Sequence, residues 1–327
     1  MAAKHLDKTT EKFVADLEAQ KGPPLYKMSV KDAREVLNKV QANPGTMPTV
    51  LIEDDKILCE NQEVYVRFVR PAQSVGVLPV IMYFHGGGWI LGNKETHDRL
   101  IREIAHRANA CVVFVNYSPS PEAHYPKPIE EAYAATKYIA ENAHAMDLDA
   151  SRLVVMGDSV GGNMAAAVTL LAKERKGPKI SHQFLFYPVT DASFDTPSYK
   201  EFANGPWLTK AAMEWFWNAY APKVADRKKP TASPLQASLD QLKDLPAALV
   251  ITDENDVLRD EGEAYAQKLK SAGVDVTHKR MNGTIHDFLM LNALKDTQPA
   301  REALELAVTT LKKVLAEPKA MKKRKAA

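Results

Sequence analysis

This chain of 327 residues has few cysteines, no long apolar run and a small net charge. Two cysteines, Cys59 and Cys111, are too few for a disulfide framework or for a zinc site built from thiolates. No run of about 18 apolar residues is available to span a membrane. The first 13 residues are charged and lack the apolar segment of a secretory signal peptide. We therefore expect a cytoplasmic protein without a membrane span.

The formal net charge is only +2, from 43 basic and 41 acidic side chains. This balance gives no electrostatic reason to expect a nucleic-acid partner. Residues 318–327 contain five basic side chains and no acidic one, so residues 1–317 carry a formal charge of −3. We expect this basic tail to be disordered. A dinucleotide-binding fold is also excluded, because no G-x-G-x-x-G sequence follows the first strand–helix turn.

The hydrophobic pattern changes twice along the chain. Residues 6–42 have amphipathic helical spacing, and residues 49–70 have the alternation of an antiparallel hairpin. Short apolar runs then alternate with helical stretches, which is typical of a parallel sheet with helices on both faces. The expected strands are residues 80–84, 111–115, 153–156, 184–187, 247–251 and 274–281, and the expected helices are residues 96–107, 129–143 and 160–174.

Residues 189–245 interrupt this alternation. The segment contains five prolines and three of the four tryptophans, so it is too long for a simple connection and too aromatic to be disordered. We expect a lid-like insertion within one large α/β domain, rather than a second domain in series.

A serine lies at the centre of the sequence Gly-Asp-Ser-Val-Gly, residues 157–161. An expected strand precedes it and an alanine-rich helix follows, which is the setting of a nucleophile elbow. Gly157 and Gly161 allow the backbone to pass through a sharp turn without a Cβ clash. We therefore expect Ser159 to be a nucleophile at the carboxyl end of the sheet. A structural serine in a tight turn is the alternative interpretation.

Three consecutive glycines, in the sequence HGGGW at residues 85–89, directly follow an expected strand. Bare backbone N–H groups in such a loop can stabilise a developing negative charge on oxygen. We expect the oxyanion donors to be the N–H groups of Gly86, Gly87 and Val160. His85 is expected to anchor the loop through hydrogen bonds rather than to act as a base.

At these motifs the sequence resembles the hormone-sensitive-lipase-like branch of the α/β-hydrolases, which includes bacterial carboxylesterases and acetyl esterases. The resemblance covers roughly residues 50–315 and extends to residues 256–262 and 283–288. It departs from the family pattern at Val160, which replaces alanine, at Val257, which replaces proline, and across residues 117–122. The resemblance implies a mostly parallel eight-stranded sheet and a helical cap from residues 1–45 and 189–245. It implies neither a metal nor a cofactor.

A serine hydroxyl needs a base within hydrogen-bond reach, and the base needs an orienting carboxylate. In this fold the chain order is serine, acid, histidine. His286 is favoured as base over His278, because it follows an expected strand in a loop with a glycine. Asp256 matches the family's acid and follows an expected strand, but other acids compete with it. They are Asp253, Glu254 and Asp260, the last of which is expected to cap a helix.

We hypothesise that the protein is a serine carboxylesterase that hydrolyses short- to medium-chain acyl esters through an acyl-enzyme intermediate. An amidase or formamidase of the same fold and a non-catalytic ligand-binding protein are the alternatives, and a homodimer is left open. The expected pocket residues could instead pack on the core, since tryptophans suit burial. They are Trp89, Asp158, Tyr187, Trp207, Phe216 and Phe288.

Overall fold

The computed structural model describes residues 5–59 and 62–316 of the chain. The basic tail expected at residues 318–327 lies outside the described residues. One eight-stranded sheet organises the fold, with the strand order β1-β2-β4-β3-β5-β6-β7-β8. The strands are β1 (Val50–Cys59), β2 (Gln62–Pro71), β3 (Leu78–Phe84), β4 (Cys111–Asn116), β5 (Leu148–Asp158), β6 (His182–Phe186), β7 (Ala247–Asn255) and β8 (Val276–Ile285).

The pairing of the strands follows their hydrophobic pattern. β1 pairs antiparallel with β2, and β2 pairs antiparallel with β4. The other neighbours are parallel, from β4 and β3 through to β8. Every residue of β3 and β6 is buried, as parallel strands covered on both faces require, whereas β2 buries alternate residues such as Val64 and Val66. The predicted α/β fold with a mostly parallel eight-stranded sheet is confirmed.

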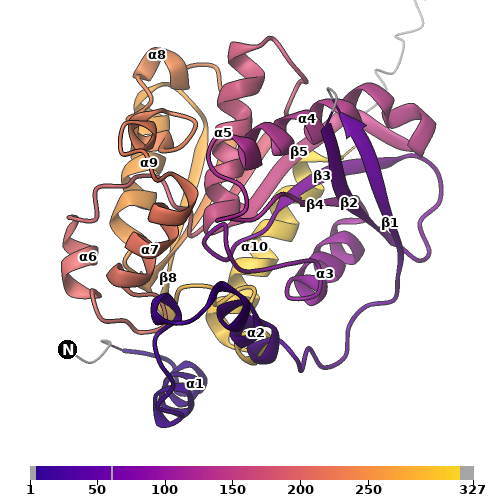
Figure 1. Cartoon of the computed structure of the whole chain (residues 1–327). Coiled ribbons are helices and arrows are strands. Elements are labelled where there is room, and N and C mark those ends of the chain that lie inside the picture. The colour runs from indigo at the N-terminus through magenta and orange to yellow at the C-terminus, as the bar shows by residue number, and fades with distance from the viewer. Residues whose placement is uncertain (1–4, 60–61, 317–327) are drawn as a thin grey trace, which may run out of the picture.

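Helices cover both faces of the sheet (Figure 1). α3 packs against α10 on one face, and α4 packs against α5 on the other. The α-helices are α1 (Lys8–Ala19), α2 (Val30–Val40), α3 (Asp98–Ala108), α4 (Lys127–Asn142), α5 (Val160–Glu174), α6 (Pro197–Glu201), α7 (Lys210–Tyr220), α8 (Leu239–Leu242), α9 (Arg259–Ser271) and α10 (Gln298–Val314). Short 3-10 turns are η1 (Leu25–Lys27), η2 (Ala143–Met146), η3 (Asp226–Lys228), η4 (Pro234–Gln236) and η5 (Asn292–Leu294). No helix in the described ranges is both long and apolar enough to cross a membrane.

Two expectations about local structure need correction. Tyr187 was expected to end a strand, but β6 ends at Phe186 and Tyr187 turns with a φ of 36°. Asp260 does not cap its own helix, because α9 begins at Arg259 with Leu258 as its N-cap. The Asp260 carboxylate instead accepts a hydrogen bond from the backbone N–H of Ser198, in the first turn of α6, at 2.7 Å. It thus fastens the inserted segment to the sheet domain.

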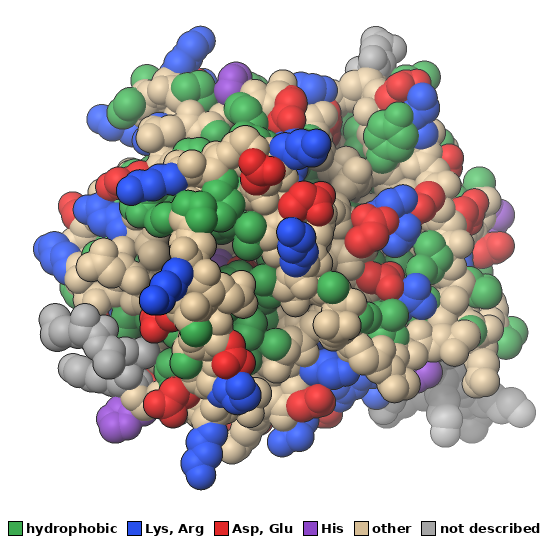
Figure 2. All heavy atoms as spheres, turned by 60° about the horizontal axis from the view of Figure 1, so that its bottom comes forward, with side chains coloured by type: hydrophobic (Ala, Val, Ile, Leu, Met, Phe, Trp, Pro, Cys, Tyr) green, Lys and Arg blue, Asp and Glu red, His purple; other side chains and the backbone are tan. Residues whose placement is uncertain are grey.

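The N-terminal segment and the insertion meet on one side of the sheet. The insertion contains α6, α7 and α8, and its half-buried Trp207 packs against Phe13 of α1 with ring centroids 5.7 Å apart. The backbone N–H of Asp7 also donates to the carbonyl of Gly283 in β8. Figure 2 turns the face with α1 and α2 toward the viewer, and hydrophobic side chains gather there around a hollow.

The turn between β5 and α5 leaves no space for a side chain at its glycines. A Cβ atom at Gly161 would lie 1.9 Å from the carbonyl oxygen of Phe84, at the end of β3. A Cβ atom at Gly157 would lie 2.3 Å from the Gly161 backbone. Both contacts are with backbone, which cannot rotate away. The turn can therefore close against β3 only with glycine at both positions.

Gly161→Ala should lower the free energy of unfolding by about 3 kcal/mol or more, because the new methyl group must push α5 away from β3. Denaturant unfolding monitored by circular dichroism measures the change. Gly22→Ala is the control, since no atom lies within 4 Å of a Cβ at Gly22. Equal stability of Gly161→Ala and the wild-type protein would contradict the proposed packing.

Candidate active site

Ser159 occupies a strained turn at the carboxyl end of β5. Its φ of 55° and ψ of −121° are unusual for a residue with a side chain, and such strain concentrates at functional sites. A backbone hydrogen bond stabilises this strained conformation, because the Ser159 N–H donates to the carbonyl of Phe186 at 2.8 Å. As the N-cap of α5, Ser159 lies at the positive end of the helix. Its hydroxyl points away from the helix, toward the loop after β8.

His286 lies directly after β8 and joins Ser159 to an acid. Its Nε2 lies 2.9 Å from the Ser159 hydroxyl oxygen, and its Nδ1 lies 2.7 Å from Asp256 Oδ2. With Asp256 ionised, Nδ1 carries the proton and donates, which leaves Nε2 to accept the serine proton. Asp256 is fixed in turn, since its Oδ1 accepts a hydrogen bond from the Leu258 N–H at 3.0 Å. The structure thus brings together the three residues that the sequence pointed to.

Two of the competing residues, His278 and Glu254, are placed elsewhere. His278 contacts the Thr252 hydroxyl at 3.0 Å and has no contact with Ser159. Glu254 accepts from the Gly283 N–H at 2.8 Å. Glu261, in the first turn of α9, is fully buried and accepts from the Thr190 and Asp191 N–H groups. Burial raises its pKa well above the usual range.

The loop that carries His286 is held by two side chains that sequence analysis did not single out. Arg99 of α3 is buried and donates to the carbonyls of Leu289 and Met290. Gln41, at the end of α2, donates to the Met290 carbonyl at 2.8 Å and accepts from the Asn292 N–H at 2.9 Å. These contacts link segments about 190 and 250 residues apart, so no local sequence signal could have found them.

The glycine loop after β3 departs from expectation at Gly86. Its N–H donates to Asp158 Oδ1 at 3.2 Å, so this group is not available to a substrate oxygen. The N–H groups of Gly87, Gly88 and Val160 donate to no group in the described part of the chain. Gly87 and Gly88 have φ values of 107° and 64°, a region that favours glycine. The unpaired donors beside Ser159 are therefore Gly87, Gly88 and Val160.

Asp158, which was expected among the pocket residues, supports the glycine loop. It is fully buried and accepts hydrogen bonds from the Tyr83 hydroxyl at 2.7 Å and from His97 Nε2 at 3.2 Å. Burial alone would raise the pKa of Asp158, but His97 and Tyr83 beside it lower the pKa below its usual value. A buried charge needs such partners. Because Asp158 precedes Ser159, it couples the turn to the loop.

His85 anchors the loop as expected from its position. Its Nδ1 donates to the Gly86 carbonyl at 2.8 Å, and its ring stacks on Tyr117 with centroids 4.3 Å apart. Burial lowers the pKa of His85 to about 3, so the ring stays neutral at physiological pH.

The aromatic residues expected in a pocket separate into two groups. Trp89 is fully buried and stacks on Tyr220 of α7 with centroids 4.0 Å apart, so it packs in the core instead. The other four lie beside His286, beside residues next to it, or beside the glycine loop. Tyr187 meets the His286 ring edge-on at 5.0 Å and Phe288 at 5.5 Å, and both are buried. The Phe216 ring fills the space beside Gly88, where a Cβ would lie 2.1 Å from it, and Trp207 Nε1 donates to Asp287 at 2.9 Å.

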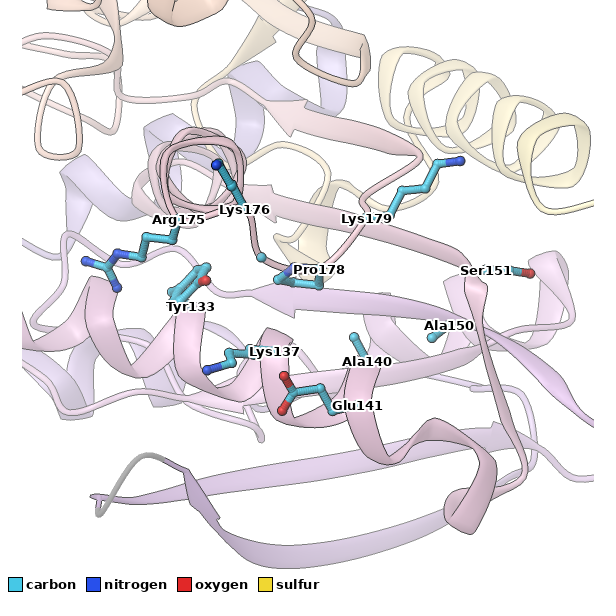
Figure 3. Close-up of a pocket in the computed structure, with 11 residues that line it drawn as sticks. Tyr133, Lys137, Ala140, Glu141, Ala150, Ser151, Arg175, Lys176, Pro178 and Lys179 are labelled. Atoms are coloured by element: carbon cyan, nitrogen blue, oxygen red, sulfur yellow. The ribbon is translucent and has the colours of Figure 1, made fainter.

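A separate surface depression of about 630 Å³ lies at the opposite end of the sheet (Figure 3). It is formed by α4, by the chain after α5 and by the start of β5, with Arg175, Lys176 and Lys179 among its lining residues. Ser151, near the start of β5, also lines it, whereas Ser159 follows the end of that strand. This depression is therefore remote from the site around Ser159.

Known proteins resemble nearly the whole chain. The profile of a family described as having the α/β-hydrolase fold matches residues 81–290. An α/β-hydrolase of Acanthamoeba polyphaga mimivirus is 40% identical, over 95% of this chain and 88% of its own length. Ethyl acetate hydrolase of Pseudomonas putida is 33% identical, over 92% of this chain and 95% of its own. The crystal structure of a thermostable esterase from Pseudomonas putida superposes with a TM-score of 0.95 at 48% identity, covering 96% of this chain and 99% of that one.

The carboxylates of Asp256 and Asp287 lie next to the His286 ring and affect its pKa. Burial disfavours the imidazolium, but Asp256 and Asp287 more than compensate and raise the pKa of His286 above its usual value. Asp287 Oδ1 lies 3.4 Å from His286 Nε2, on the side of Ser159. Burial raises the pKa of Asp287 itself, and the nearby His286 and Trp207 N–H groups oppose that effect.

Asp287→Asn should lower the pKa of His286 by about one unit, because a removed negative charge no longer stabilises the imidazolium. An NMR titration of the His286 ring measures the shift. Asp240→Asn, an exposed acid in α8, should leave the titration unchanged. If Asp287→Asn titrates as the wild-type protein does, Asp287 carries no charge near the ring.

Proposed function

The chain belongs to the α/β-hydrolase family, and from this we propose that it is a serine carboxylesterase working through an acyl-enzyme intermediate. The observation that carries the proposal is the hydrogen-bonded chain of Ser159, His286 and Asp256. His286 Nε2 lies 2.9 Å from Ser159 Oγ, and His286 Nδ1 lies 2.7 Å from Asp256 Oδ2. Relatives that resemble nearly the whole chain are named esterases or ester hydrolases, which supports the same reaction class.

In the proposed reaction, Ser159 Oγ attacks the carbonyl carbon of an ester while His286 Nε2 takes the hydroxyl proton. Asp256 keeps the other ring proton on Nδ1 and stabilises the imidazolium. His286 then protonates the leaving alcohol, and an acyl group remains on Ser159. Water, activated by His286, attacks the acyl-enzyme and releases the acid. Each step uses only side chains that are already in hydrogen-bond contact.

The tetrahedral intermediate carries a negative oxygen, which needs fixed donors. We assign these to the N–H groups of Gly87, Gly88 and Val160, since Gly86 is committed to Asp158. The network of Asp158, His97 and Tyr83 then holds the loop at the distance that the intermediate requires. Preorganised donors of this kind are typically worth about 3 kcal/mol each in the transition state.

The substrate class follows from the crowding around Ser159. We propose that residues 1–45 and 189–245 form a cap over it, since Phe13 and Trp207 pack together there and Trp207 binds Asp287. The Phe216 ring lies against Gly88 and restricts the space for the acyl chain. Short- to medium-chain acyl esters fit this arrangement best, and the relative named ethyl acetate hydrolase agrees with it. The cytoplasmic location, the lack of a nucleic-acid partner and a homodimer stay predictions.

Ser159→Ala should lower kcat for p-nitrophenyl acetate by about 10⁴-fold or more, because no other group can form the acyl-enzyme. The initial burst of p-nitrophenol should also disappear in stopped-flow measurements. Ser271→Ala, which changes an exposed serine at the end of α9, is the matched control. Residual wild-type turnover in Ser159→Ala would overturn the mechanism. Faster cleavage of the matched anilide than of the ester would instead favour an amidase.

A series of p-nitrophenyl esters from acetate to palmitate should give the highest kcat/KM for the short chains. Phe216→Ala should move the optimum toward longer chains, because it removes the ring beside Gly88 and opens the acyl side. Trp215→Ala changes a neighbouring ring on the same helix and serves as control. An optimum at palmitate in the wild-type enzyme would show that the cap does not limit the acyl chain.

A further inference from the structure

A second acid lies behind the triad and takes no part in the mechanism described so far. Asp253, in β7, is fully buried, and neither of its carboxyl oxygens accepts a hydrogen bond within the described ranges. One of these oxygens, an oxygen of Asp256 and a ring nitrogen of His286 all lie within 4.8 Å of one another. The ladder between β7 and β8 is irregular just after Asp253, and Asp256 directly follows the end of β7.

The surroundings of Asp253 do not suit a negative charge. The titratable groups near it include two more acids, Asp256 and Asp287, together with Tyr187 and His286. Of these, only His286 can be cationic, and its Nδ1 proton is already donated to Asp256. An ionised carboxylate without a donor is very costly to bury, whereas a neutral carboxylic acid has an O–H to donate. Burial, and then the charge of Asp256, raise the pKa of Asp253 well above the usual range.

Asp256 is the natural acceptor for that proton. Its carboxylate and that of Asp253 have oxygens within 4.8 Å of each other, and the two Asp256 oxygens receive one hydrogen bond each, from the Leu258 N–H and from His286 Nδ1. Each carboxylate oxygen can accept a second bond. Two carboxyl groups this close hold one proton between them, because like charges in one buried site cannot both be ionised.

We propose that Asp253 is a positioning residue of the triad, a neutral carboxylic acid whose O–H donates to the Asp256 carboxylate and orients it toward His286. The inference rests on the proposed esterase function and deepens it. The proton of Asp253 stays in place through the cycle, so Asp256 keeps a single negative charge. His286 then lies next to the carboxylates of Asp256 and Asp287, whereas Asp253 is neutral and adds no third negative charge. This limits how strongly the ring holds its proton, and the ring can return to the neutral form that accepts the serine proton.

Two substitutions separate a neutral donor from a buried charge. Asp253→Asn keeps a donor to Asp256 and should leave kcat, KM and the acid limb of the pH profile of kcat/KM close to wild type. Asp253→Val removes the donor at similar volume. It should lower kcat about tenfold with little change in KM, and should move the acid limb to higher pH, because an Asp256 without this bond holds the imidazolium more strongly. Glu254→Gln changes the adjacent residue of β7 and is the matched control.

Each contrary result has a definite meaning. If Asp253 is ionised, Asp253→Asn removes a charge near His286, and the acid limb moves to lower pH by about one unit or more. If Asp253 has no influence on Asp256, Asp253→Val keeps the wild-type kcat and pH profile. Either result would overturn the proposal.

Infrared difference spectroscopy gives a readout that does not depend on turnover. The wild-type protein near neutral pH should show the carbonyl band of a buried protonated carboxylic acid that Asp253→Asn lacks and Glu254→Gln keeps. Absence of that difference would refute the neutral form. Failure of the esterase function itself would be seen separately, as wild-type protein without Ser159-dependent turnover, and would leave the infrared result intact.

Discussion

The site depends on one close backbone approach, between the turn that follows β5 and the end of β3. Gly161 lies so near the carbonyl of Phe84 that no side chain fits between them. This contact places Val160 and the helix N-terminus of α5 beside the loop of residues 85–89, which begins where β3 ends. Ser159, in the same turn, has a positive φ, and its hydroxyl lies 2.9 Å from His286 Nε2. Nucleophile and loop are therefore parts of one rigid unit at the carboxyl edge of the sheet.

The buried acids around this unit differ in the number of hydrogen bonds that each one receives, and this difference sets the role of each. Asp158 receives three hydrogen bonds, from Tyr83, Gly86 and His97, and is kept ionised. Asp256 receives one from a backbone N–H and one from His286. Asp253 receives no hydrogen bond from the residues that the structure describes, and it is suited to the neutral form. The same residue type thus holds a loop, orients a base or, in the form proposed for Asp253, donates a hydrogen bond, according to its neighbours.

Aromatic side chains show the same dependence on surroundings. Trp89 and Tyr220 stack in the core, where they join the glycine loop to α7. Tyr187 packs edge-on against the His286 ring, Phe288 packs against Tyr187, and all three are buried. Trp207 connects α1 to Asp287 through a ring contact and a hydrogen bond. In the sequence these residues are alike, because an apolar side chain suits a pocket wall and a core equally.

Local sequence determined much of this protein. Alternating apolar runs and helices predicted the sheet, the glycines around Ser159 predicted its sharp turn, and chain order together with the family resemblance pointed to Asp256 and His286. The burial of Trp89, the use of the Gly86 N–H and the role of Asp158 were decided only by tertiary structure, as were the clamps made by Arg99 and Gln41. The reason is physical. Turns and periodicity depend on neighbours along the chain, whereas a hydrogen bond such as that between His97 and Asp158, 61 residues apart, exists only once the strands have paired.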